Sequence, residues 1–208
     1  MPLYKTLYPN SQTTVKIWKI TESYDDLRHS LKLTDENSSR VMNMKSEIHQ
    51  RAFLSVRQLL ATFGYVDTDL YYDDNGKPHL KDGKFISITH SFIFSAVIIS
   101  EESVGIDIEK QREKIKLIAK KFIDYEDQYL LATDDLYLRK LTVIWCIKES
   151  LYKQFATPGL SFKQNTLVIP FNLVDQETVS WIDYKDCKYR YEAHYFEFEG
   201  FTCAYVLP

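Results

Sequence analysis

The chain has 208 residues, of which 45% are hydrophobic and 14% aromatic, and this indicates a folded globular protein rather than a disordered one. Its formal net charge of −3 provides no overall basic field that would draw it to nucleic acid or to an anionic membrane. The three cysteines, Cys146, Cys187 and Cys203, have neither metal-binding nor redox spacing, so we expect reduced thiols in a cytoplasmic protein.

The first half of the sequence predicts a strand, two helices and then a group of strands. Alternating polar and apolar residues predict a strand at 14–20, and a short helix is expected at 24–33. Apolar residues recur at helical spacing over 38–63, which predicts one long helix that Gly64 ends. Asp73–Pro78 is rich in turn-forming residues. Three strands are expected after this turn, at 85–90, 93–100 and 103–109.

The second half repeats this succession of helices and strands. Short helices are predicted at 114–123 and 124–132. A long helix is predicted at 134–155, and Pro158 and Gly159 stop it. Four strands are expected to follow, at 166–170, 179–184, 189–197 and 201–207.

The two halves are therefore similar in their expected organisation. Phe94–Ile98 is faintly like Thr202–Val206, and each segment follows a predicted hairpin. We expect an α+β fold of two similar α/β-hairpin halves, related by a pseudo-twofold duplication, each with a long helix packed on an antiparallel sheet. The predicted halves are residues 1–101 and 102–208, with the active site between them.

Val104–Glu109 predicts a strand with two acidic side chains on one face. Because side chains alternate along a strand, Asp107 and Glu109 point away from its apolar residues. Neighbouring carboxylates repel each other unless a cation lies between them, although half-exposed strands often show the same alternation without any function. Gly105 favours a functional reading, because glycine weakens a strand and often marks the close approach of a ligand or another backbone.

Trp145–Lys153 lies in the long helix of the second half and adds a third carboxylate. Helical spacing places Glu149 and Lys153 four residues apart on one face, with Lys148 alongside. Together with the acidic strand, they suit a hard divalent metal that holds a polyphosphate, since carboxylates bind the metal and lysines the phosphate. The alternative is an ordinary surface ion pair, worth about 0.3–0.5 kcal/mol.

Other charged residues have two readings each. His90 ends a strand in Ser87–Ser91, where hydroxyl groups and turn amides could bind an anion, but a histidine satisfied within a hairpin is the more common case. The lysines of 114–123 form either a solvated face or a docking patch for an acidic partner. Arginines on an amphipathic helix are most often a solvated face, and the first long helix carries Arg40, Arg51 and Arg57.

Several other classes of function lack their signatures. The sequence contains no nucleophile elbow, dinucleotide fingerprint or glycine-rich phosphate loop of the ATPase kind, so side chains and strand-end amides would have to hold any phosphate. The N-terminal residues have no apolar core of a signal peptide, so none is expected. The longest apolar run, Ala96–Ile99, is too short to span a membrane.

In their order along the chain, these motifs resemble those of the 4′-phosphopantetheinyl transferases, specifically the larger, surfactin-synthetase-activating type. The resemblance covers roughly residues 35–165. It rests on Arg51, Asn75–Pro78, Phe85–Ser91, Val104–Glu109, Phe122 with Glu126, Trp145–Lys153 and Gly159–Ser161. The family usually has Asn at the position of Ser87 and Ser at that of Thr89, and both differences keep small polar groups.

The resemblance also implies roles for individual residues. Asp107, Glu109 and Glu149 would bind Mg²⁺, and Glu149, Lys153 and Asp107 would be catalytic, with Glu149 as the candidate base. Lys148 and Lys153 would hold the pyrophosphate of coenzyme A. The remaining coenzyme A residues would be Arg51 and His90 on the 3′-phosphate, Thr89 in the same segment, and Gly76, Lys77 and Pro78 against the adenine.

The implied reaction is Mg²⁺-dependent transfer of the 4′-phosphopantetheine arm from coenzyme A to a serine of an apo acyl or peptidyl carrier protein. The leaving group would be 3′,5′-adenosine bisphosphate, and the enzyme a cytoplasmic monomer with no nucleic-acid or membrane partner. Two alternatives stay open. One is a metal-dependent phosphohydrolase that acts on a polyphosphate with the same carboxylates, and the other is a non-catalytic module that binds coenzyme A or a carrier. The cognate carrier is not indicated.

Overall fold

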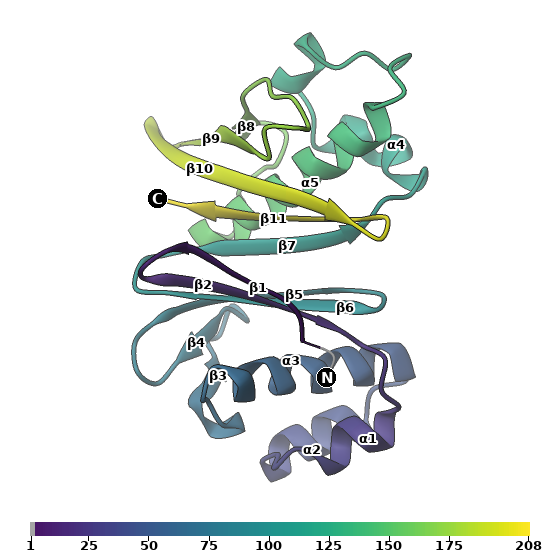
Figure 1. Cartoon of the computed structure of the whole chain (residues 1–208). Coiled ribbons are helices and arrows are strands. Elements are labelled where there is room, and N and C mark those ends of the chain that lie inside the picture. Colours follow the sequence, from purple (N-terminus) through teal and green to yellow (C-terminus); the bar gives the residue numbers. More distant parts are fainter. Residues whose placement is uncertain (1–2) are drawn as a thin grey trace. The chain divides into compact units, whose positions relative to one another are not determined.

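The computed structural model describes residues 3–208. The described chain forms two compact units, which divide between Glu102 and Ser103. Each unit contains an antiparallel sheet and a long helix that packs on it, so the predicted α+β fold class is confirmed (Figure 1). None of the helices in the described part of the chain has the length and apolarity needed to cross a membrane.

The first unit is built on a four-stranded sheet in the order β1-β2-β6-β5. Its strands are β1 (Leu3–Asn10), β2 (Thr13–Lys19), β5 (Phe85–Ser91) and β6 (Phe94–Ser100). A separate hairpin pairs β3 (Leu70–Tyr72) with β4 (Pro78–Leu80). Every residue of β6 is buried, as expected for an inner strand on which helix α3 packs.

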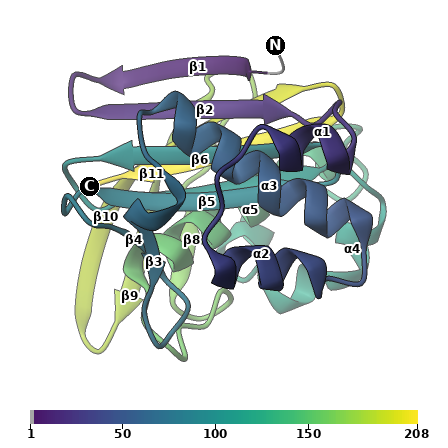
Figure 2. The ribbon, with the colours of Figure 1, turned by 90° about the horizontal axis from the view of Figure 1, so that it is seen from below.

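Three helices cover this unit: α1 (Tyr24–His29), α2 (Asp35–Met42) and α3 (Glu47–Thr62). Figure 2 shows α3 running across the sheet, with α1 and α2 beside it. The apolar side of α3 packs into a core that includes Trp18, Leu54, Leu59, Leu60 and Val97. Burial of this side, rather than helix propensity alone, stabilises α3.

The long helix predicted over 38–63 is wrong, because two helices occupy that range. Helix α2 ends at Met42, and the amide of Asn43 still donates back to Ser39 O. The Gln50 side chain, from α3, donates to the carbonyl oxygens of Val41 and Met44, both at 3.1 Å. The carbonyl oxygen of Val41 also accepts from the Met44 amide at 3.2 Å, so a side chain from the next helix adds to the capping at the end of α2.

The second unit has a five-stranded sheet in the order β7-β11-β10-β9-β8. Its strands are β7 (Gly105–Lys110), β8 (Thr166–Val168), β9 (Glu177–Tyr184), β10 (Cys187–Phe198) and β11 (Phe201–Leu207). Helix α5 (Tyr137–Phe155) packs on β7 and β11 over a core that includes Leu141, Ile144, Ile147, Leu151 and Val206. The β7 strand therefore lies at the edge of its sheet and directly against α5.

The shorter helices of this unit differ from the prediction. Helix α4 covers only Lys114–Ile118, with a 3-10 turn at Ala119–Lys121, and 124–132 contains only the 3-10 turn η3 (Tyr125–Gln128). Helix α5 ends at Phe155, and the left-handed backbone of the next residue, Ala156 (φ 51°), stops the helix two residues before Pro158.

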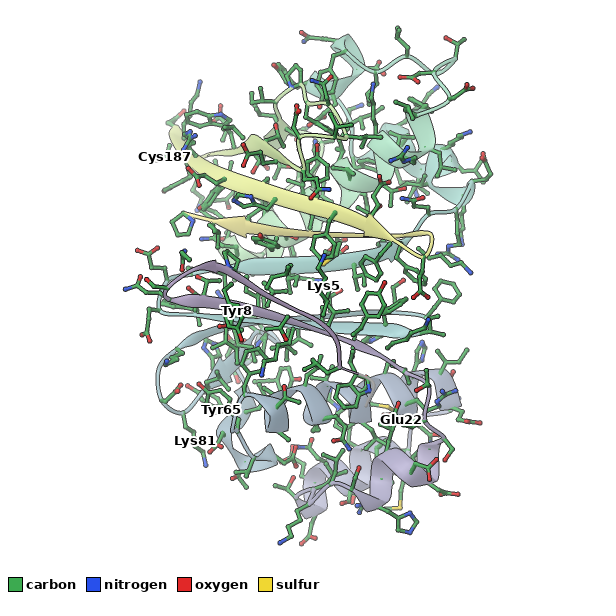
Figure 3. All side chains as sticks on the ribbon, viewed as in Figure 1. Lys5, Tyr8, Glu22, Tyr65, Lys81 and Cys187 are labelled. Carbon is green, nitrogen blue, oxygen red and sulfur yellow. The ribbon has the colours of Figure 1, made fainter. Side chains whose placement is uncertain are left out.

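All three cysteines are free thiols. Cys146 and Cys203 have no exposed surface and belong to the interior of the second unit. Cys187 is exposed where the chain turns from β9 into β10, as Figure 3 shows.

Candidate active site

The acidic face predicted for 104–109 is formed by the edge strand β7. Asp107 is only 5% exposed and lies opposite Ala204 of β11, while the half-buried Glu109 lies opposite Thr202. Their spacing of two residues places both carboxylates on the same side of the strand.

Helix α5 brings a lysine and a third carboxylate to this face. The Lys153 ammonium donates to Asp107 Oδ1 at 2.7 Å and to the carbonyl oxygen of Ile106 at 3.0 Å. Burial, as the largest cause, and the negative charges of Asp107 and Glu109 together raise the pKa of Glu149 to about 7, while Lys153 opposes them. The three carboxylates and Lys153 therefore act on one another electrostatically.

Gly105 allows β7 and α5 to approach this closely. A Cβ atom at position 105 would lie 1.9 Å from the carbonyl oxygen of Ser150, far inside van der Waals contact. The Ser150 hydroxyl donates to Ala204 O on β11 at 3.1 Å, so the same turn of helix is also attached to the next strand. The close backbone approach predicted for Gly105 is confirmed, and the partner is α5.

Lys148 lies elsewhere, although it precedes Glu149 in the same helix. Its side chain is fully buried and forms an ion pair with Glu126 of η3, with Nζ 2.9 Å from Oε1. Nζ also donates to the carbonyl oxygens of Phe122, Phe162 and Thr166 at 2.7–3.0 Å. An ammonium has three N–H groups, and these acceptors use all of them, so the pyrophosphate role predicted for Lys148 is not supported.

In the first unit, His90 lines a cavity of about 390 Å³. The ring of His49 lies near that of His90, with centroids 6.3 Å apart. Arg57 is 4% exposed and donates from Nε to Asp67 at 3.3 Å, while its Nη2 has no hydrogen-bond partner within residues 3–208. The complete lining is Arg40, Met44, His49, Phe53, Val56, Arg57, Tyr72, Ile88 and His90. It contains four basic side chains and no carboxylate.

Comparison with known proteins relates the second unit to one family. Residues 103–206, half of the chain, match the 4′-phosphopantetheinyl transferase superfamily. The chain belongs to this superfamily. Enterobactin synthase component D from Salmonella typhi and from Salmonella typhimurium are each 34% identical to it over 86 residues. The aligned part spans 40% of this chain and 37% of each relative, well under half of their length.

In a member of this superfamily, the carboxylate cluster is the candidate metal site. Three carboxylates are the oxygen donors that a hard divalent cation such as Mg²⁺ prefers, so the donor chemistry fits. Within residues 3–208, however, no group of three or more His, Cys, Asp or Glu side chains stands close enough to hold a metal ion. The Lys153 ammonium lies against Asp107 instead. The triad of Asp107, Glu109 and Glu149 stays a prediction.

The residues predicted on the 3′-phosphate are separated in the structure. Arg51 does not line the cavity of His90, because it belongs to a pocket of about 70 Å³ and donates to Ile20 O at 3.3 Å. The cause is helical geometry. His49, Phe53 and Arg57 follow one another at intervals of four residues and share one side of α3. Arg51 comes two residues after His49, so it is rotated from His49 by about 200° around the helix axis. The predicted pairing of Arg51 with His90 is therefore not found.

Two other predicted coenzyme A segments have different relations to this cavity. Thr89 is buried, and alternation along β5 places it on the opposite face from Ile88 and His90. Gly76 and Lys77 lie in the turn between β3 and β4, and Pro78 begins β4. In this turn Asp73 Oδ1 accepts from the amides of Asn75 and Lys77. Pro78 pairs with Tyr72, which lines the cavity, so this hairpin adjoins it.

The sequence could have indicated the basic lining more strongly than it did. From the sequence alone, Arg40 and Arg57 are expected on a solvated helix face, and no role is expected for His49. The pattern of His49, Phe53 and Arg57 is the available signal, because residues four apart share one side of a helix. Arg40 is on α2 and has no such signal, since only the fold places its guanidinium 5.5 Å from the Phe53 ring.

Proposed function

We propose that the protein transfers the 4′-phosphopantetheine arm from coenzyme A to a serine hydroxyl of an apo acyl or peptidyl carrier protein. The observation that carries this proposal is the cluster of Asp107, Glu109, Glu149 and Lys153 inside the segment that matches the family. The motif order described above favours the larger type of this enzyme. The free thiols favour a cytoplasmic protein, and we propose that it acts as a monomer.

Asp107, Glu109 and Glu149 would hold Mg²⁺, which supplies positive charge next to the phosphoryl oxygens when bound. Without that charge, the three carboxylates would repel both one another and the diphosphate of coenzyme A. The donor chemistry supports this assignment, and so does the raised pKa of Glu149, to which burial contributes most and the negative charges of Asp107 and Glu109 add.

The proposed reaction is a displacement at phosphorus. The serine oxygen forms a bond to the phosphorus that carries the pantetheine arm, and the P–O bond within the pyrophosphate breaks, which releases 3′,5′-adenosine bisphosphate. Glu149, directly or through a water molecule, is the candidate group to accept the hydroxyl proton. Lys153 would neutralise negative charge that develops on the leaving oxygen.

The basic cavity of the first unit is our candidate site for the 3′-phosphate of coenzyme A. Arg40, His49, Arg57 and His90 line it, and the buried Arg57 Nη2 has no protein acceptor within the described residues. A phosphate could accept from several of these groups, and charge-assisted hydrogen bonds are stronger than neutral ones. Phe53 and Tyr72 add aromatic surface, and the Gly76–Pro78 turn beside them would meet the adenine.

A transfer assay tests this function directly. The purified protein is incubated with coenzyme A, Mg²⁺ and a panel of apo acyl and peptidyl carrier proteins, and mass spectrometry detects the added arm. The expected result is one arm per carrier, with loss of transfer in Glu149→Gln. Breakdown of coenzyme A without any carrier would identify a phosphohydrolase instead. Binding of coenzyme A with no chemical change would identify a non-catalytic module.

A further inference from the structure

The most completely buried charges of the second unit are those of Lys148 and Glu126. Neither side chain has exposed surface, and Lys148 Nζ lies 2.9 Å from Glu126 Oε1 and 3.0 Å from Oε2. Both carboxylate oxygens have a second donor, since Oε1 accepts from the Val168 amide at 2.8 Å and Oε2 from the Asp124 amide at 3.3 Å. The charge pair is therefore fully hydrogen-bonded, as a buried pair must be to persist.

Hydrogen bonds of the pair connect α5 with segment 119–128 and with the chain from the loop after α5 into β8. Lys148 comes from the middle of α5 and donates to the carbonyl oxygen of Phe122, which follows the 3-10 turn Ala119–Lys121. It also reaches Phe162, in the loop after α5, and Thr166, at the start of β8. Glu126 connects η3 to β8 through Val168. Segment 119–128, the loop after α5 and β8 are all attached to α5 at this one point.

The same attachment fixes the rotation of α5. Consecutive residues of a helix differ by about 100° in direction, so an anchored Lys148 determines where Glu149 and Lys153 point. Gly105 brings β7 against the helix two residues after Lys148, at Ser150. The carboxylate cluster thus lies between two fixed points, the buried ion pair and the Gly105 contact.

We propose that Lys148 and Glu126 are positioning residues, which hold Glu149 and Lys153 toward β7 and hold segment 119–128 against α5, and that Lys148 does not contact coenzyme A. The catalytic consequence rests on the proposed function, whereas the coupling between the two side chains does not. Burial lowers the pKa of Lys148, and Glu126 opposes that effect, as expected for an ammonium kept charged by one partner.

The test is a double-mutant cycle of Lys148→Met, Glu126→Leu and the double variant. Removing one partner leaves an unpaired buried charge, whereas replacing both with apolar residues of similar size is often tolerated. We expect each single variant to lower the urea midpoint strongly and the double variant to lose much less than the sum of the two single losses, although the carbonyl oxygens of Phe122, Phe162 and Thr166 lose their donor. We expect the double variant to have a KM for coenzyme A within about twofold of wild type.

A lysine on the pyrophosphate would behave differently. Losing a hydrogen bond to a charged phosphate should raise the KM for coenzyme A by roughly 10- to 100-fold, and removing Glu126 could not restore it. That result in the double variant would overturn the proposal, as would strictly additive losses of urea midpoint. If a single variant does not fold, the double variant is still compared directly with wild type.

Two controls make the result specific. Lys163→Met removes a charge from the same region, but Lys163 is exposed and its Nζ is 3.9 Å from Asp124, so we expect little change. Lys153→Met should impair transfer, and Glu126→Leu should not rescue it. If wild type modifies no carrier, the transferase proposal fails, while the unfolding cycle still decides whether Lys148 and Glu126 are coupled.

Discussion

Lys153 Nζ lies 2.7 Å from Asp107 Oδ1 and 3.0 Å from Ile106 O, so this ammonium is held against the strand that carries two of the three clustered carboxylates. The lysine is 28% exposed at its side chain and Asp107 only 7%, so the pair opens to solvent from the helix side. A cation that enters the cluster must share Asp107 with Lys153 or displace it.

If Asp107, Glu109 and Glu149 bind Mg²⁺ as proposed, removal of that ion should abolish transfer. We expect EDTA to stop the reaction and Mg²⁺ or Mn²⁺ to restore it. Asp107→Ala or Glu149→Gln should lower kcat by about 100- to 1,000-fold, the usual range for loss of one preorganised electrostatic group, with an unchanged circular dichroism spectrum. Near-normal turnover in either variant would remove these residues from the metal site.

Dephospho-coenzyme A tests the basic cavity. If His90 binds the 3′-phosphate, His90→Ala should lose about 10- to 100-fold in kcat/KM with coenzyme A and little more with the dephospho donor, because the partner group is already gone. Arg40→Ala should behave in the same way. Arg51→Ala is the matched control, because it lines a different pocket and should discriminate between the donors as wild type does. If His90→Ala also keeps the wild-type discrimination, His90 does not bind that phosphate.

The basic segment around α4 should affect the carrier only. Lys116 and Lys120 are exposed, and carriers of this class are expected to be acidic around the modified serine. Charge reversal at both positions should lower kcat/KM for the carrier about 10-fold at low salt and less at high salt, with coenzyme A binding unchanged. Lys188→Glu, on the exposed start of β10, is a control for charge alone. An effect that does not depend on salt would argue against steering.

Asp67 should make the stability of the first unit depend on acid pH. Burial opposes ionisation of Asp67, but hydrogen bonds from Thr34 and Asn37 and the charge of Arg57 outweigh it and hold the pKa of the carboxyl below its ordinary value. A depressed folded pKa contributes stability above the unfolded value of about 3.9, and this stability is lost as pH falls through the folded pKa.

Asp67→Asn tests this dependence. We expect the variant to be about 1–3 kcal/mol less stable than wild type at pH 7, and the difference to shrink as pH falls below about 4. Urea unfolding at pH 7, 5 and 3.5 measures it. A difference that is equal at all three pH values would show that Asp67 contributes through packing rather than through its charge.

Much of the cluster was predictable because two short-range rules determine it. Alternation along 104–109 puts Asp107 and Glu109 on one face, and the spacing of four residues puts Glu149 and Lys153 together. The role of Lys148 was not predictable in this way. Its partner Glu126 lies 22 residues earlier in the sequence. Only the packing of η3 on α5 shows that the positive charge of Lys148 is paired with this carboxylate inside the protein.

The errors in secondary structure have a similar origin. Apolar periodicity continues through 43–46 without a glycine or proline, and the cap-forming residue types at Asn43 and Ser46 are the local sign of the break that the Gln50 side chain stabilises. The β1 strand was missed because it is an edge strand of mixed exposure, without the regular alternation that marked 14–20. A similar error concerns Arg51 and His90, which match motifs of one ligand site but line different pockets. The direction of the Arg51 side chain depends on which side of α3 is buried, and the motif alone does not show this.

The placement of the three cysteines makes the protein its own folding sensor. A maleimide should react with Cys187 alone in the native state, because Cys146 and Cys203 are fully buried and burial raises the pKa of the Cys146 thiol. Both hidden thiols belong to the second unit, so their labelling would report the opening of the unit that carries the carboxylate cluster. A mass increase of one label or of three would then distinguish, in a single spectrum, a variant that is folded and inactive from one that has lost its structure.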